Sequence, residues 1–169
     1  MQRLIGIFIL LIGLGGCVAP EDRLEAESPE AFCKRLTRTL KGTAPETVLW
    51  PTFELVSGVT IEDHRSSRAK EALQEQLPAA RKDFDAEVVM VQKKWAAMRA
   101  TGDQLGVQWE SLQLDSFDME LFFIDNLYQL SAVLHLSDGQ QQFQLPFKDA
   151  VRIRTDWYAP RMGVLVVKP

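Results

Sequence analysis

Apolar and polar residues follow three successive patterns along this chain, and each pattern predicts a different structure. The first segment, up to residue 14, is almost wholly apolar after Arg3. Between residues 66 and 101 the apolar residues recur with the spacing of one helix face. Beyond Gly102 apolar and polar residues alternate, as in strands that bury one face. Helices followed by antiparallel strands predict an α+β domain with a curved sheet packed on the long helix.

Two helices and one ambiguous segment are expected before the sheet. A first helix spans residues 28 to 42, with Ser28 as N-cap and Gly42 after its last turn. The long helix has a break or kink at Pro78, because proline removes a backbone donor and clashes with the preceding turn. Between them, residues 43 to 65 hold a short helix or a strand, and the pattern does not decide which. The apolar face of the long helix consists of Leu77, Phe84, Val88, Val91, Trp95 and Met98.

The clearest strands flank Asp138 and Gly139, a dipeptide typical of two-residue hairpin loops. A loop of these two residues would place His135 opposite Gln142 on one face. On the other face it would pair only apolar residues, namely Leu134 with Phe143, Ala132 with Leu145, and Leu130 with Phe147. Further strands are expected at residues 107–117, 119–124, 150–154 and 163–167.

This order of elements, the hairpin at Asp138 and the late pair Trp157 and Tyr158 resemble the cystatin-like or nuclear-transport-factor-like fold. In those folds a cone-shaped sheet encloses helices and often a pocket. The resemblance implies an architecture and assigns no functional residues.

The apolar N-terminus ends in Leu14-Gly15-Gly16-Cys17. Its apolar run is shorter than the roughly 20 residues that span a membrane, which predicts a removable export signal. The four residues resemble the lipobox of bacterial lipoproteins. The resemblance implies cleavage after residue 16, lipidation of Cys17 and, because Val18 rather than Asp follows, sorting to the outer membrane. Residues 17 to 27 would then be a lipidated tether, and residues 28 to 169 a single domain facing the periplasm.

Composition narrows the range of functions. The 19 Lys and Arg residues against 23 Asp and Glu residues give a mildly acidic chain without the clustered basic face of a nucleic-acid-binding protein. With Cys17 acylated, Cys33 is left without a disulfide partner, and its helical position beside Phe32 and Leu36 predicts a small buried hydrophobe. No cofactor motif is present in the sequence.

Few residues are candidates for chemistry. His135, Gln142, Trp157 and Tyr158 are candidate pocket or binding residues, although a solvent-facing His135 and a structural Trp157 are the simpler interpretations. The sequence Glu62-Asp63-His64 is more typical of an exposed loop than of a metal site. Asp115 and Asp118 of "LDSFD" could form a carboxylate pair, but a turn is the simpler interpretation of this segment. We therefore expect neither metal ligands nor catalytic residues.

Two functions remain open. The first is an envelope lipoprotein whose non-catalytic domain binds another envelope protein in an accessory or assembly role. The second is a protein with a pocket for a small apolar ligand or, as its less favoured form, a hydrolase or isomerase on the same scaffold. A deep cavity with convergent polar groups near His135 would favour the second function.

Overall fold

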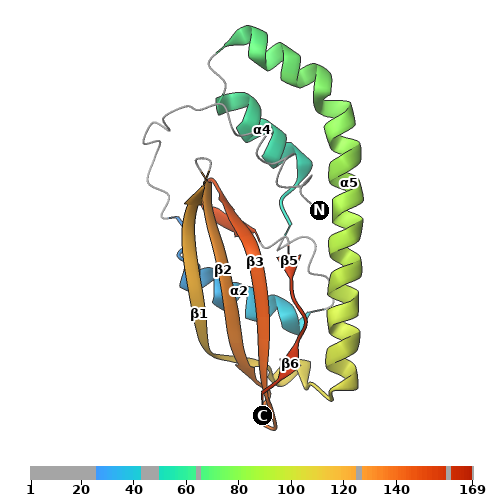
Figure 1. Cartoon of the computed structure of the whole chain (residues 1–169), viewed down its shortest axis with the longest axis vertical. Coiled ribbons are helices and arrows are strands. Elements are labelled where there is room, and N and C mark those ends of the chain that lie inside the picture. Colours follow the sequence, from blue (N-terminus) through green and yellow to red (C-terminus); the bar gives the residue numbers. More distant parts are fainter. Residues whose placement is uncertain (1–25, 43–49, 64–65, 125–126, 159–160, 169) are drawn as a thin grey trace.

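The computed structural model describes residues 26–42, 50–63, 66–124, 127–158 and 161–168. Within these ranges three α-helices precede a six-stranded antiparallel sheet, which confirms the predicted α+β class (Figure 1). The helices are α2 (Pro29–Lys41), α4 (Phe53–Asp63) and α5 (Ser67–Gln104). A short 3-10 helix (Trp109–Ser111) leads into the strands β1 (Gln113–Ile124), β2 (Leu127–Ser137), β3 (Gln142–Ile153), β4 (Asp156–Tyr158), β5 (Arg161–Met162) and β6 (Val166–Val167).

The sheet is built around three long strands in the order β1, β2, β3, and the short strands β4, β5 and β6 all pair with β3. Strand β1 therefore lies at an edge of the sheet. The predicted strands at residues 107–117 and 119–124 are replaced by the 3-10 helix and one continuous β1, with a bulge between Leu114 and Ser116. The "LDSFD" segment thus lies within a strand rather than in a turn.

The register predicted for the β2–β3 hairpin is wrong by two residues. Leu134 pairs with Leu145 and His135 with Gln144, because the loop contains four residues, Asp138 to Gln141, instead of two. The Asp138 carboxylate holds this longer loop by accepting hydrogen bonds from the backbone N–H groups of Gln140 and Gln141, both at 2.9 Å. A shift of two residues leaves every side chain on its predicted face, because side chains alternate with a period of two.

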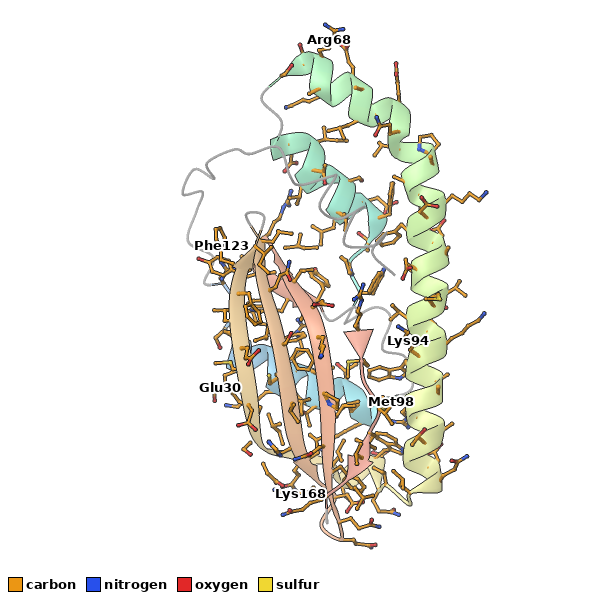
Figure 2. The ribbon with its side chains drawn as sticks, viewed as in Figure 1. Glu30, Arg68, Lys94, Met98, Phe123 and Lys168 are labelled. Carbon is orange, nitrogen blue, oxygen red and sulfur yellow. The ribbon has the colours of Figure 1, made fainter. Side chains whose placement is uncertain are left out.

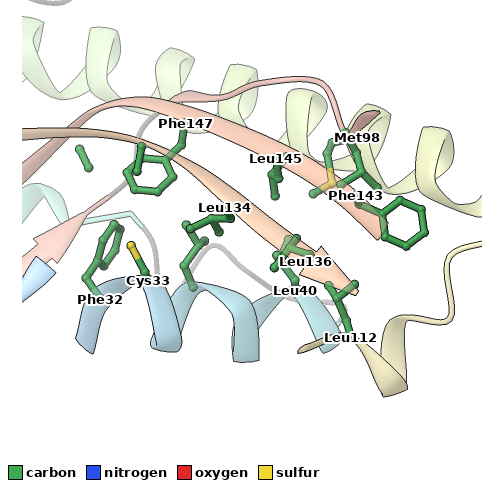
Figure 3. Close-up of a cluster of buried hydrophobic side chains, with 14 of the residues drawn as sticks. Phe32, Cys33, Leu40, Met98, Leu112, Leu134, Leu136, Phe143, Leu145 and Phe147 are labelled. Atoms are coloured by element: carbon green, nitrogen blue, oxygen red, sulfur yellow. The ribbon is translucent and has the colours of Figure 1, made fainter. Parts of the chain in front are cut away.

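Helix α2 covers one face of the sheet, which we call the inner face. Its start is as predicted, since the Ser28 side chain accepts a hydrogen bond from the Ala31 N–H and Gly42 follows the last turn. Figure 3 shows Phe32, Cys33 and Leu40 of α2 directed at the strands. The core formed there also includes Leu36, Leu112, Leu130, Leu134, Leu136, Phe143, Leu145, Phe147 and Trp157.

Helix α5 runs beside the sheet and is continuous through Pro78, with a bend in its N-terminal third (Figure 1). Its C-terminal part adds Trp95 and Met98 to the core. The predicted apolar face is the less exposed face of the helix, and these two residues are its fully buried members. Most of the helical cover of the sheet consequently comes from α2.

Helix α4 resolves the segment that the sequence left undecided, at least over the described residues 50–63. Its Val56 packs with Val151 and Ile153, which lie on the outer face of β3, in a second and smaller apolar cluster. Phe84 of α5 joins this cluster and also contacts the ring of Phe53 at a centroid distance of 5.5 Å. The helical pair α4–α5 is therefore fixed to the outer face at the C-terminal end of β3.

Candidate docking surface

The second half of β1 exposes large apolar side chains on both faces of the sheet. Glu120 is the sole polar residue in the run from residue 119 to residue 124. Leu121 remains 50% exposed and Phe123 62% exposed, and each of the other three apolar residues is more than 40% exposed. The exposed apolar residues of the run are Met119, Leu121, Phe122, Phe123 and Ile124.

The exposure begins beyond the part of β1 that packs against the main core. In the first half of β1, Leu114 and Phe117 pack against the main core. Met119 and Leu121 lie on the same inner face as Phe117, because their partners on β2 are the inner residues Ala132 and Leu130. We call Met119 and Leu121 the docking edge: they lie on the inner face of the edge strand, yet about half of each side chain is exposed.

Acidic residues accompany the docking edge on the outer face. Asp118 and Glu120 pair with Val133 and Ser131 of β2, whose side chains point away from the core. The Asp118 side chain is largely exposed even though one carboxylate oxygen, Oδ2, lies 2.8 Å from Nε2 of His135. This part of β1 is therefore apolar on its inner side and negatively charged on its outer side.

His135 lies on the outer face and both of its ring nitrogens have partners. Nε2 is bonded to Asp118, and Nδ1 lies 3.4 Å from the Nε2 amide nitrogen of Gln144. A neutral ring with hydrogen on Nε2 satisfies both contacts, with Gln144 as the donor to Nδ1. This arrangement ties β1, β2 and β3 together and leaves neither nitrogen of the ring without a contact.

The four candidate binding residues are not brought together by the fold. Gln142 begins β3 beside the loop, where its carbonyl accepts a hydrogen bond from the Lys168 N–H at 2.8 Å. Trp157 is buried in the main core against Phe32. Tyr158 packs with the outer cluster, where burial raises the pKa of its hydroxyl. Trp157 thus has the structural role of closing the sheet onto α2.

A network centred on Glu27 connects the start of the described chain to the sheet. The Glu27 N–H donates to the Thr155 carbonyl at 2.8 Å, and the Glu27 carbonyl accepts from the Trp157 indole N–H at 2.8 Å. Its carboxylate accepts from Arg35 Nε at 2.8 Å and from the Trp157 backbone N–H at 3.1 Å. Glu27, expected at the end of the tether, is therefore bonded to the domain.

The remaining candidates divide between described and undescribed residues. Cys33 is fully buried, as predicted, and loss of solvation raises the pKa of its thiol to about 12. Asp115 binds the Ser137 hydroxyl at 2.8 Å and does not pair with Asp118. Cys17 and His64 lie outside the described residues.

Two further properties concern the described part of the chain as a whole. In it, no group of three or more His, Cys, Asp and Glu side chains is placed to hold a metal ion. None of its helices combines the length and the apolar character needed to cross a membrane.

Sequence reasoning missed the exposed apolar residues in the second half of β1, although a signal for them exists. Residues 121 to 124 read Leu-Phe-Phe-Ile, four apolar residues in succession. In a strand of an antiparallel sheet, such a run places apolar side chains on both faces, whereas one face is usually polar. Its exposure could not be anticipated, because the position of α2 over the sheet depends on the tertiary packing.

Comparison with family models, with curated proteins and with solved structures finds no match for this chain.

Proposed function

We propose that this protein is a lipid-anchored component of the bacterial cell envelope whose domain binds an envelope protein without catalysing a reaction. The lipobox-like Leu14-Gly15-Gly16-Cys17 supports the anchor, and Val18 favours the outer membrane. The observation that carries the binding function is the docking edge. Half-exposed Met119 and Leu121 on an edge strand are what a partner strand would cover.

The partner would contribute an extended segment that adds to the sheet beside β1. An edge strand presents backbone donors and acceptors to an incoming strand, and alternate side chains of that strand then meet the two faces. Beside β1, the inner side chains of the partner would meet Met119 and Leu121, and its outer ones Asp118 and Glu120. The complementary segment therefore alternates apolar residues with lysine or arginine.

Photocross-linking in living cells tests whether a partner protein contacts the docking edge. A benzophenone amino acid replaces Leu121 in the full-length chain, and in a matched control it replaces Val89, an apolar residue of α5 that is 47% exposed. We expect a discrete protein adduct from position 121 and none from position 89. Glu120→Lys should weaken the adduct, because it reverses a charge that the partner strand is expected to meet. Equal labelling from both positions would reject the docking edge.

The anchor is tested separately by metabolic labelling with palmitate. The unmodified chain should incorporate label and lose residues 1 to 16, whereas Cys17→Ser should do neither, because a serine hydroxyl does not replace the thiol in lipid transfer. Cys33→Ser is the control and should label normally, since Cys33 is buried in the core. Palmitate incorporation by the Cys17→Ser protein would end the lipoprotein interpretation.

A further inference from the structure

The end of the sheet at which β1 finishes and β2 begins carries a compact group of exposed apolar and aromatic side chains. Phe123 and Tyr128 are cross-strand partners with ring centroids 4.9 Å apart, on the inner side of the sheet. Phe122 and Ile124 precede and follow Phe123 on β1 and are exposed on the outer side. We call these four residues the tip. Figure 2 shows Phe123 at the end of the long strands opposite to Lys168.

A cationic side chain lies at the inner side of the tip. The Arg152 guanidinium lies 4.1 Å from the ring centroid of Tyr128 and 5.9 Å from that of Trp157. Aromatic rings beside an arginine are typical of protein surfaces that sit among lipid headgroups, because the rings enter the boundary region and the cation attracts anionic lipids. The tip therefore has the composition of a membrane-contacting surface.

The described part of the chain begins at this same end of the sheet, with Glu27 bonded to it. Trp157, which Arg152 touches, binds the carbonyl of Glu27 through its indole N–H. Thr155, whose carbonyl accepts the Glu27 N–H, lies in the turn between β3 and β4. Glu27 is thus connected to Tyr128 by three successive contacts, through the side chains of Trp157 and Arg152.

The short distance along the chain from Cys17 to Glu27 determines which end of the sheet faces the membrane. Ten residues reach about 33 Å when fully extended and about 17 Å as a flexible coil. Strand β2, with 11 residues, is about 36 Å long. A lipid on Cys17 would therefore hold the tip within reach of the bilayer and keep the opposite loop at Asp138 away from it.

From this placement we propose that the tip inserts into the headgroup region of the membrane that holds the lipid anchor. The inference rests on the proposed lipidation of Cys17 and adds a second, reversible contact beside it. The tip orients the domain, so that β1 rises from the bilayer with the docking edge above the lipid surface. Apolar contact and a headgroup-binding arginine supply this contact without a membrane-spanning segment.

Quenching by brominated lipids tests the insertion directly. Full-length processed protein is reconstituted into vesicles of phosphatidylethanolamine and phosphatidylglycerol, and tryptophan fluorescence is compared between Phe123→Trp and Gln140→Trp. Both positions are exposed, but residue 140 lies in the loop at the other end of β2 and β3. We expect Phe123→Trp to be quenched about twofold more strongly than Gln140→Trp, as for a ring in the headgroup boundary.

This experiment measures the lipidation of Cys17 and the insertion of the tip separately. The mass of the protein reports whether Cys17 is acylated; unacylated protein is coupled through Cys17 to a maleimide lipid, so that the quenching is measured in either case. Equal quenching of the two variants, or none in either, overturns the proposal. If the fluorescence of Phe123→Trp changes with protein concentration but not with brominated lipid, the tip contacts a second copy of this chain. That result would also overturn the proposal. Circular dichroism verifies that each variant is folded.

Discussion

Leu121 and Leu130 are opposite each other on neighbouring strands and point to the same face of the sheet, yet they have opposite environments. Leu130 is fully buried in the main core, whereas Leu121 is 50% exposed. The two positions share residue type and orientation, but Leu130 lies between β1 and β3, whereas Leu121 lies on the edge strand. Leu130 is therefore enclosed by strands on both sides and belongs to the core beneath α2, whereas Leu121 has a neighbouring strand on one side and lies outside that core.

This pair separates two uses of the same hydrophobic residue. A buried leucine stabilises its own domain through area removed from water and through close packing. A half-exposed leucine at an edge leaves part of that contribution unrealised until another surface covers it. We expect substitutions in the two strands to differ accordingly, and the following experiments test the contrast from the largest effect to the smallest.

The largest effect is expected from Leu130→Arg. The substitution removes a fully buried side chain and places an unpaired charge in the core, which should lower the free energy of unfolding by about 4 kcal/mol or more. Thermal unfolding followed by circular dichroism measures the loss. A stable, cooperatively folding Leu130→Arg protein would contradict the assignment of β2 to the core.

A smaller loss is expected from Asp138→Ala at the closed end of the sheet. The Asp138 carboxylate accepts hydrogen bonds from the backbone N–H groups of Gln108, Gln140 and Gln141, each at 2.9 Å. Their removal should cost about 2–3 kcal/mol, because three part-buried backbone donors lose a charged acceptor. Urea unfolding at neutral pH measures this, with Gln140→Ala, which retains every backbone donor, as the control.

The same carboxylate should make stability depend on pH. Burial raises the pKa of Asp138, but the backbone donors together outweigh it and hold the pKa below its ordinary value of 3.8. Its contribution is therefore fully present above 3.8 and is lost as the pH falls through the lower value of the folded state. Asp138→Asn should flatten the acid limb of the stability curve, and an unchanged limb would refute the role of this group.

Cys33 gives a chemical test of the buried region. Cys33→Ser should cost about 1–2 kcal/mol, because a hydroxyl replaces a buried apolar thiol. In the unsubstituted protein, alkylation of Cys33 should be slow at pH 8 and accelerate on unfolding, while a Leu121→Cys variant should react at once. Peptide mapping distinguishes the cysteines. Rapid labelling of native Cys33 would show that the core beneath α2 is open.

The burial of this thiol also predicts an alkaline effect with the opposite direction to that of Asp138. Because the pKa of Cys33 is raised from 9.0 to about 12, its stabilising contribution is complete below 9.0 and is lost as the pH rises towards 12. Cys33→Ala lacks the ionisable group and should lose less stability over that interval. The melting temperatures of both proteins are compared between pH 8 and pH 11. An equal decrease in the two proteins would contradict a buried, neutral thiol.

The smallest effect is expected from Leu121→Arg, the counterpart of the first substitution. The new side chain can extend into solvent from the edge, so the free energy of unfolding should change by at most about 0.5 kcal/mol. The substitution should nevertheless abolish partner cross-linking through an adjacent benzophenone at Met119. A large loss of stability would show that the docking edge belongs to the core.

The sequence predicted those features that depend on neighbours along the chain. Helix α2 was located by its capping residues, and the inner faces of β2 and β3 by alternation. The hairpin register was missed because the side chain of Asp138 closes a four-residue loop, a choice that also involves the distant Gln108. The docking edge and the tip were missed for a related reason, since exposure depends on which strands a helix covers.

The attachment of Glu27 also determines how the domain responds to tension. A pull on the residues that precede Ala26 meets the hydrogen bonds of Glu27 to Thr155 and Trp157 before it reaches the first turn of α2. The load then passes into β4 and through it into β3, the strand with the most neighbours in the sheet. On this account the hydrogen bonds of Glu27 would have to break before a pulling force could unwind the first turn of α2.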